Sequence, residues 1–113
     1  MHELGVTENI IDITLAKAGE AQAGKVLKIN LVVGELSGYV PDCVQFYFDT
    51  LSKGTIAEGA VLHFDTVPPE LCCRDCSTIF DPRDAPWTCP KCGSQSIEVS
   101  KGRELYIDSV EVE

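Results

Sequence analysis

The sequence predicts an α+β protein: a small three-stranded sheet with two helices, interrupted by a second small domain. Three observations lead to this fold class. Apolar residues recur at helical spacing in two segments, short β-rich runs follow each of them, and one polar stretch holds four paired cysteines. The order is helix, strand, helix, strand, insertion, strand. We therefore expect one discontinuous domain over residues 1–69 and 99–113, with an inserted domain over residues 70–98.

The first half of the chain supplies a helix and a strand. The helix is expected to end near Gly19 or Gly24, and a partly alternating strand follows over residues 26–33 and ends at Gly34. An acidic side chain at Glu3 suits the positive end of the helix dipole. The apolar stripe of this helix is formed by Leu4, Ile10, Ile11, Leu15 and Ala18.

A second helix is expected to begin at Pro41 and to run to about Ser52, with Val44, Phe48 and Leu51 as its apolar stripe. A second strand follows over residues 61–67, before two prolines. From Arg103 the strand pattern returns, and its alternation slips by one residue near Asp108 and Ser109, which indicates a β-bulge. This last strand should return to the sheet begun by the first two.

Composition excludes several classes of protein. The chain has 113 residues, and 9 basic against 18 acidic side chains give a formal net charge of −9. Such a charge argues against binding nucleic acid through its phosphates. No apolar run reaches the ~20 residues of a membrane span, and an acidic N-terminus argues against a signal peptide. We therefore expect a small, acidic, soluble protein of the cytoplasm.

Four of the six cysteines form two pairs, Cys73-x2-Cys76 and Cys89-x2-Cys92. In a reducing compartment such pairs hold metal more often than they form disulfides, and a two-residue gap lets a tight turn aim both thiolates at one ion. Four thiolates complete a tetrahedron and leave no open position. We therefore predict a structural Zn(II) and a zinc-ribbon-like insertion whose folding depends on the metal.

Free buried thiols or a redox pair are the alternative for these cysteines. Cys72 competes as a ligand in principle, but its spacing to Cys76 is one residue too long for the usual turn. Cys43 lies in the second expected helix and is predicted to be a small buried hydrophobic residue.

The N-terminus permits a different metal chemistry. A single histidine near a terminus is most often a solvated side chain. At position 2, however, the terminal amine of Met1, the backbone nitrogen of His2 and its imidazole can form fused chelate rings. The backbone nitrogen of Glu3 completes a plane of nitrogen donors, which suits Ni(II) or Cu(II). The Glu3 carboxylate can add an axial or outer oxygen.

The opening Met1-His2-Glu3-Leu4, the strand that leads into Gly34-Glu35-Leu36-Ser37, and the two cysteine pairs before a terminal strand together resemble the HypA/HybF family of hydrogenase nickel-insertion metallochaperones. The resemblance covers essentially the whole chain. It implies a nickel-binding α/β domain, with transient Ni(II) on Met1, His2 and Glu3 and His2 as the indispensable side chain. It also implies a zinc domain between the second and third strands.

The resemblance further implies two partners, the large-subunit precursor of [NiFe]-hydrogenase and a nickel-insertion GTPase of the HypB type. Some relatives also serve urease. The sequence leaves open which hydrogenase or urease is served, and whether the protein acts as a monomer or a homodimer.

One departure from the family concerns histidines. Several relatives carry a histidine directly after a cysteine pair, whereas Ser77 and Gly93 occupy these places here. Any metal-site rearrangement that relies on such histidines is therefore not expected. His63 is the other histidine of the chain, and on its expected strand we predict a structural or exposed side chain.

We predict that the protein is not an enzyme, because the sequence shows no nucleophile–base pair, no phosphate-binding glycine loop and no open catalytic zinc. The leading hypothesis is a nickel metallochaperone. The alternative is a zinc-ribbon adaptor that binds another protein without transferring metal, and such an adaptor has no use for His2. A thiol oxidoreductase would need cysteines that react without a chelator.

Overall fold

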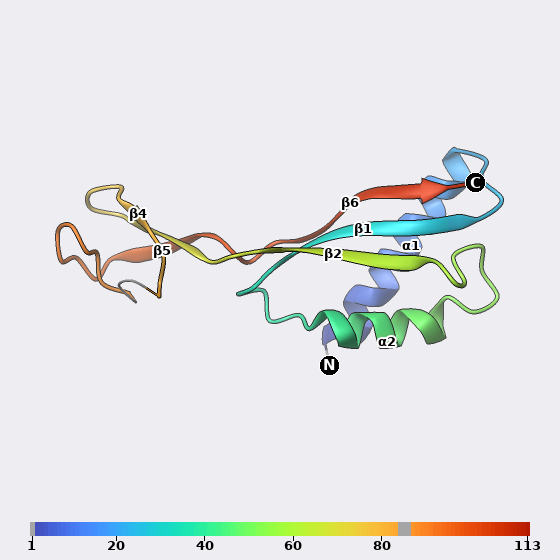
Figure 1. The fold of residues 1–113 in the computed structure, drawn as a ribbon, viewed down its shortest axis with the longest axis horizontal. Coiled ribbons are helices and arrows are strands. Elements are labelled where there is room, and N and C mark those ends of the chain that lie inside the picture. Colours follow the sequence, from blue (N-terminus) through green and yellow to red (C-terminus); the bar gives the residue numbers. More distant parts are fainter. Residues whose placement is uncertain (1, 84–86) are drawn as a thin grey trace. The chain divides into compact units, whose positions relative to one another are not determined.

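The computed structural model describes residues 2–83 and 87–113 (Figure 1). In chain order the elements are α1 (His2–Glu20), β1 (Val26–Gly34), α2 (Pro41–Leu51), β2 (Val61–Val67), β3 (Glu70–Cys73), β4 (Ile79–Phe80), β5 (Ile97–Lys101) and β6 (Leu105–Val112). The chain divides into two compact units. Residues 1–32, 39–65 and 106–113 form the first unit, and residues 33–38 and 66–105 form the second.

The first unit contains both helices and a three-stranded sheet in the order β2-β1-β6. The prediction that the last strand returns to the sheet of the first two is therefore confirmed. Within this unit, Ile29 and Leu31 of the central strand β1 are buried, while Lys28, Asn30 and Val32 are partly exposed. This alternation means that one face of the sheet is packed against the helices.

Helix α1 begins at His2, and its buried stripe differs in part from the predicted one. Ile10, Ile11 and Ala18 are buried as expected, but Leu4 is 39% exposed, so its assignment to the stripe was wrong. Polar side chains complete the buried face. Residues three or four positions apart lie on the same face of a helix, so a polar residue at such a position is buried together with its apolar neighbours. These polar residues are Glu3, Thr7 and Thr14.

Helix α2 confirms the predicted start at Pro41 and the burial of Val44 and Phe48. Two expectations for this helix were wrong. Leu51 is exposed, and Ser52 is buried in its place, since it lies four residues after Phe48. Cys43 is exposed, because its position is one residue before Val44 and about 100° away around the helix.

The second unit contains a small antiparallel sheet in the order β4-β3-β5. Its backbone segments approach each other closely. The N–H of Gly34 donates to the carbonyl of Glu104 (2.7 Å), and the N–H of Leu36 donates to that of Gly102 (2.6 Å). A Cβ atom at Gly34 would lie 2.1 Å from the carbonyl carbon of Gly102. Glycine is therefore required at position 34 by the backbone that crosses it.

Strand β2 has the predicted bounds. Strand β6 begins two residues after the predicted start at Arg103, and its exposure pattern repeats the slip seen in the sequence: Ile107 and Val110 are partly buried, whereas Asp108 and Ser109 are both exposed. The β-bulge itself stays a prediction.

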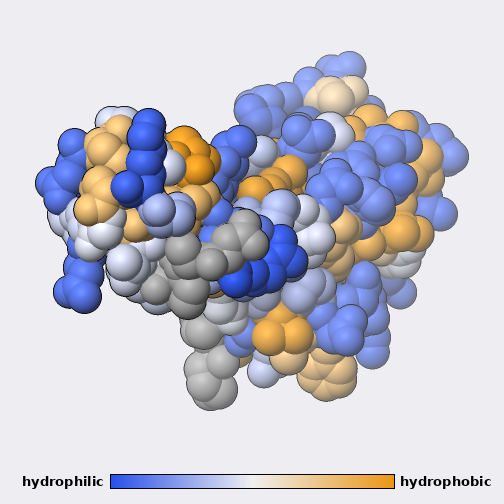
Figure 2. All heavy atoms as spheres, turned by 60° about the vertical axis from the view of Figure 1, so that its left-hand side comes forward, coloured by the Kyte–Doolittle hydropathy of each residue, from blue (hydrophilic) through white to orange (hydrophobic). Residues whose placement is uncertain are grey.

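The surface mixes polar and apolar side chains. Phe46 is the most exposed large hydrophobic residue among those described, at 67%, and Figure 2 shows hydrophobic residues dispersed among hydrophilic ones on the face it displays. Within the described part of the chain, no helix has both the length and the apolar character to cross a membrane.

Candidate metal centres

The two Cys-x2-Cys pairs lie on turns with the same backbone hydrogen bonds. In each turn, the N–H of the first cysteine donates to the carbonyl five residues later, and its carbonyl accepts the N–H four residues later. The bonds are Cys73 to Thr78 (2.9 Å), Ser77 to Cys73 (2.9 Å), Cys89 to Ser94 (2.8 Å) and Gly93 to Cys89 (2.9 Å). Each pair is therefore held on a turn of its own, with the same hydrogen-bond pattern in both turns.

Both turns end on a residue in the left-handed region. Gly93 has φ 75° and Ser77 has φ 63°. Glycine adopts this conformation readily. Serine occupies the same place in the first turn at a conformational cost, so the identical geometry of the two turns is imposed by their hydrogen bonds and not by residue type.

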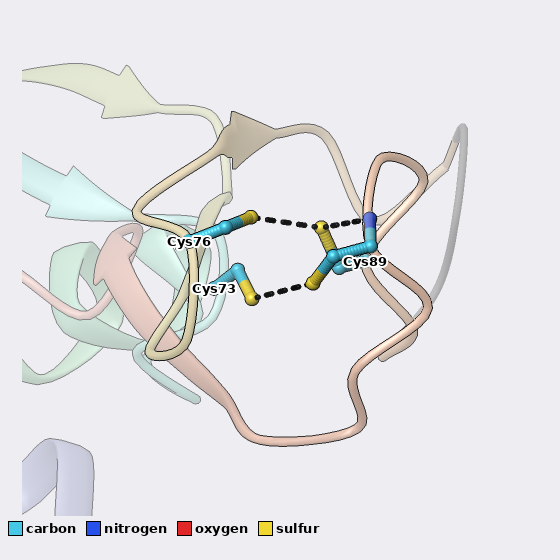
Figure 3. A group of neighbouring side chains, drawn as sticks. Cys73, Cys76 and Cys89 are labelled. Carbon is cyan, nitrogen blue, oxygen red and sulfur yellow. Dashed lines mark hydrogen bonds between the residues drawn. The ribbon is translucent and has the colours of Figure 1, made fainter.

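The two turns bring all four thiols together. The Sγ atoms of Cys73, Cys76, Cys89 and Cys92 lie within 4.8 Å of one another (Figure 3). Two contacts of 3.6 Å run across the turns, from Cys73 to Cys92 and from Cys76 to Cys89.

This geometry fits a zinc site. A tetrahedral ZnS4 centre with Zn–S distances of about 2.3 Å has sulfur–sulfur edges of about 3.8 Å, close to the observed contacts. The contacts across the turns also differ from those of a redox Cys-x-x-Cys motif, in which the reactive sulfurs belong to one pair. With four protein thiolates as ligands, no position stays open for a substrate.

Hydrogen bonds to the sulfurs prepare some of these thiols to ionise. Burial raises the pKa of the Cys89 thiol, but the N–H groups of Cys92 and Lys91, both 3.4 Å from Sγ, outweigh it and bring the pKa to about 6. Hydrogen bonding from Thr78, whose hydroxyl lies 3.0 Å from the sulfur, lowers the pKa of Cys76. Ionised thiolates are the form that binds metal.

The pKa of the Cys92 thiol is shifted in the opposite direction. The amide of Ser94 lowers the pKa of Cys92, but hydrogen bonds with Cys73 and Cys76 act in the opposite direction and raise it to about 12. Because thiols bind metal as thiolates, metal binding to the cluster is expected to release protons to solution.

Cys72 does not belong to the cluster. It precedes Cys73 on β3, so its side chain points to the other face of the strand. Burial, followed by the charge of Glu98, raises the pKa of its thiol. The preference of the sequence analysis for Cys73 as the ligand agrees with this geometry.

The predicted nickel ligands lie at the start of α1, and the structure describes them only in part. Met1 lies outside the described residues, as does the side chain of His2. Glu3 is described: its side chain is 7% exposed, and its carboxylate accepts a hydrogen bond from the N–H of Val40 (3.4 Å). Hydrogen bonds accepted by the carboxylate hold the pKa of Glu3 below its ordinary value, against the effect of burial.

His63 lies on β2 with an exposed side chain, as predicted, and its Nε2 is 2.9 Å from a carboxylate oxygen of Asp65. Two residues near the cysteines were missed by the sequence analysis. Thr78 bonds to the sulfur of Cys76, and Asp75 bonds to Ser94 across the two turns. A hydroxyl residue two positions after a cysteine was the available signal for Thr78.

The fold and the cysteine cluster define a small α+β protein whose second unit carries four thiols in an arrangement that fits a closed metal centre. A family model described as hydrogenase/urease nickel incorporation, metallochaperone, hypA matches residues 1–112. The chain therefore belongs to the HypA family.

Curated relatives and solved structures agree with this assignment. A hydrogenase maturation factor HypA of Dehalococcoides mccartyi is 45% identical over 113 residues, covering 100% of this chain and 95% of the relative. The HypA of Caldanaerobacter subterraneus subsp. tengcongensis is 41% identical over 114 residues, covering 100% of both chains.

Two solution structures share the fold. One is described as the HypA protein (TM-score 0.79, 28% identity, 99% of this chain and 96% of the other). The other is described as the Ni metallochaperone HypA from Helicobacter pylori (TM-score 0.72, 27% identity, 97% of this chain and 96% of the other).

Proposed function

We propose that this protein is a nickel metallochaperone that delivers Ni(II) during maturation of [NiFe]-hydrogenase and keeps a structural Zn(II) in its second unit. The observation that carries the proposal is membership over nearly the full chain in a family of nickel-incorporation metallochaperones. Relatives named hydrogenase maturation factor favour hydrogenase over urease as the destination.

The four-cysteine cluster is the proposed zinc site, with Cys73, Cys76, Cys89 and Cys92 as ligands. Its soft donors suit Zn(II), and the closed tetrahedron leaves no position at which a cargo ion can be loaded and handed over. Two metals with different roles therefore need two sites. In functional terms we assign residues 70–98 to the zinc domain, and residues 1–69 and 99–113 to the nickel-binding domain.

The N-terminal residues are the proposed nickel site. His2 is the first residue of α1, and amides of the first helical turn have no carbonyl partner within the helix. The His2 amide can therefore ionise and bind nickel without breaking a helical hydrogen bond. The terminal amine of Met1, the His2 imidazole and the Glu3 amide complete a planar nitrogen set that suits Ni(II).

The buried carboxylate of Glu3 suggests that the backbone and the side chain of this residue have different roles. Its hydrogen bond to Val40 fixes the start of α1 to the segment before α2. We infer that the Glu3 backbone nitrogen binds nickel while its carboxylate anchors the helix end. This hydrogen bond then holds the start of α1 in place beneath a nickel site that is built from terminal residues.

We further propose that this protein is not an enzyme and that it acts in the cytoplasm. A tetrathiolate zinc has no open position for catalysis, so this protein has no centre at which it could hydrolyse a nucleotide itself. The energy for nickel delivery must therefore come from a partner. We propose that a nickel-insertion GTPase of the HypB type supplies it and that the hydrogenase large-subunit precursor receives the nickel.

Complementation tests this proposal. In a bacterial strain that lacks its own HypA, the native protein is expected to restore hydrogenase activity, and His2→Ala is expected to leave it at background. His63→Ala is the matched control, because it removes the other histidine from an exposed strand position, and it should behave as the native protein. Full activity with His2→Ala would overturn the nickel-delivery proposal and favour the adaptor.

A further inference from the structure

Side chains join the two cysteine turns independently of the thiols. Asp75 lies between Cys73 and Cys76 in the first turn, and its carboxylate accepts a hydrogen bond from the hydroxyl of Ser94 in the second turn. The carbonyl of Ser94 also accepts the N–H of Cys89 (2.8 Å). Asp75 therefore bonds to the residue that closes the opposite turn.

Ser94 is itself held in place. Its Oγ accepts the N–H of Ser96 (3.0 Å), and the carbonyl of Ser96 accepts the N–H of Arg74 (2.9 Å). These bonds continue the antiparallel pairing of β3 with β5, in which Cys73 is opposite Ile97. The bridge between Asp75 and Ser94 thus lies where this ladder ends and the two turns separate.

We propose that Asp75 and Ser94 are a positioning pair that keeps the two turns together around the metal and thereby sets how slowly zinc leaves. This inference rests on the proposed zinc site. Zinc dissociation requires one turn to move away with its two sulfurs. While the bridge is intact, a released thiolate stays near the ion and rebinds, so that the observed dissociation is slow.

The charge of Asp75 alone predicts the opposite effect. Zn(II) with four thiolates carries a net charge of −2, and a neighbouring carboxylate repels it. If charge dominated, removing Asp75 would strengthen zinc binding, and Ser94 would not matter. The positioning pair predicts faster zinc release when either Asp75 or Ser94 is removed. Charge alone predicts slower release without Asp75 and no change without Ser94.

Zinc transfer to a chromogenic chelator separates these explanations, with the rate and the equilibrium measured on the full chain loaded with one zinc. We expect Asp75→Ala and Ser94→Ala each to speed dissociation by about 3–10-fold, which corresponds to the net energy of one hydrogen bond. The double variant should be no faster than either single variant. Asp75→Asn and Ser94→Thr keep an acceptor and a hydroxyl, and they should stay close to the native rate.

Asp81→Ala is the matched control, because Asp81 lies in the same unit but bonds to Arg83 on its own turn. It removes the same charge without touching the bridge and should leave the rate unchanged. Slower dissociation from Asp75→Ala, a native rate for Ser94→Ala, or loss of zinc that Asn and Thr do not rescue would overturn the positioning pair.

The amount of zinc that each protein binds shows whether the proposed zinc site or only the Asp75–Ser94 bridge is refuted. A native protein that takes up no zinc would refute the zinc site itself. A native protein with one zinc, beside a Ser94→Ala variant that releases it at the same rate, would refute the bridge alone. A Ser94→Ala variant that cannot be loaded, when Ser94→Thr can, supports it.

Discussion

In the unit of residues 1–32, 39–65 and 106–113, eleven buried hydrophobic side chains form one core cluster. In the unit of residues 33–38 and 66–105, the buried hydrophobic residues among those described are Val33, Leu71, Cys73 and Cys89, and two of these four belong to the cysteine cluster. Burial of apolar surface stabilises the first unit, whereas we propose that zinc coordination stabilises the second. On this proposal the first unit keeps its fold whether or not zinc is bound to the cysteines.

Among the changes considered, removal of zinc should therefore have the largest effect on stability, and this effect should be confined to the second unit. Structural zinc contributes about 10–16 kcal/mol of apparent binding free energy in small modules. A chelator strong enough to strip zinc should abolish amide protection in β3 and β5 while β1 and α2 stay protected, as measured by hydrogen exchange. Equal loss of protection in both units would contradict the comparison, and re-addition of zinc should restore β3 and β5.

The reciprocal change weakens the first unit. Phe48 is fully buried in α2, and Phe48→Ala should lower the free energy of unfolding of this unit by about 3–5 kcal/mol. Phe46→Ala is the matched control, because it removes the same side chain from an exposed position on the same helix and should cost far less. Denaturant melts followed by helix circular dichroism measure both, and zinc content should not change in either variant.

The smallest effect expected concerns an exposed ion pair of the second unit. Hydrogen bonds from Arg83 bring the pKa of Asp81 to about 2, below its ordinary 3.8. Because the folded-state pKa is lowered, the pair stabilises the unit above about pH 3.8, and this contribution is lost as the pH falls toward 2. An NMR titration of the Asp81 carboxyl should show the low pKa, and Arg83→Gln should return it toward 3.8. An unchanged pKa in that variant would contradict the assignment.

Much of the fold could be predicted from the sequence, because its elements have strong local signals. Strand β2 was predicted at its observed bounds, and Pro41 marked the start of α2. Leu4, Cys43 and Leu51 were misplaced because apolar character does not decide which side of a helix meets the core. Thr7 and Thr14 show the same limit, since polar residues fill buried helix positions that geometry assigns to them.

The cysteine cluster was predicted from spacing, because a two-residue gap determines a turn and four thiolates determine a centre. The contacts of Asp75 with Ser94 could not be predicted. They join residues 19 positions apart, at a point where two turns meet only in the folded unit. Burial of the Glu3 carboxylate against Val40 likewise depends on a loop 37 residues away.

Calorimetric titration of nickel tests most directly the central claim, that a transferable ion binds at the N-terminus and a fixed one at the cysteines. The titrated proteins are the native chain, a form with an N-terminal extension that blocks the terminal amine, and His2→Ala, all loaded with zinc. We predict one nickel per native chain, strong loss of affinity in both altered proteins, and no release of zinc. Equal nickel affinity in all three, or zinc displaced as nickel binds, would contradict the account.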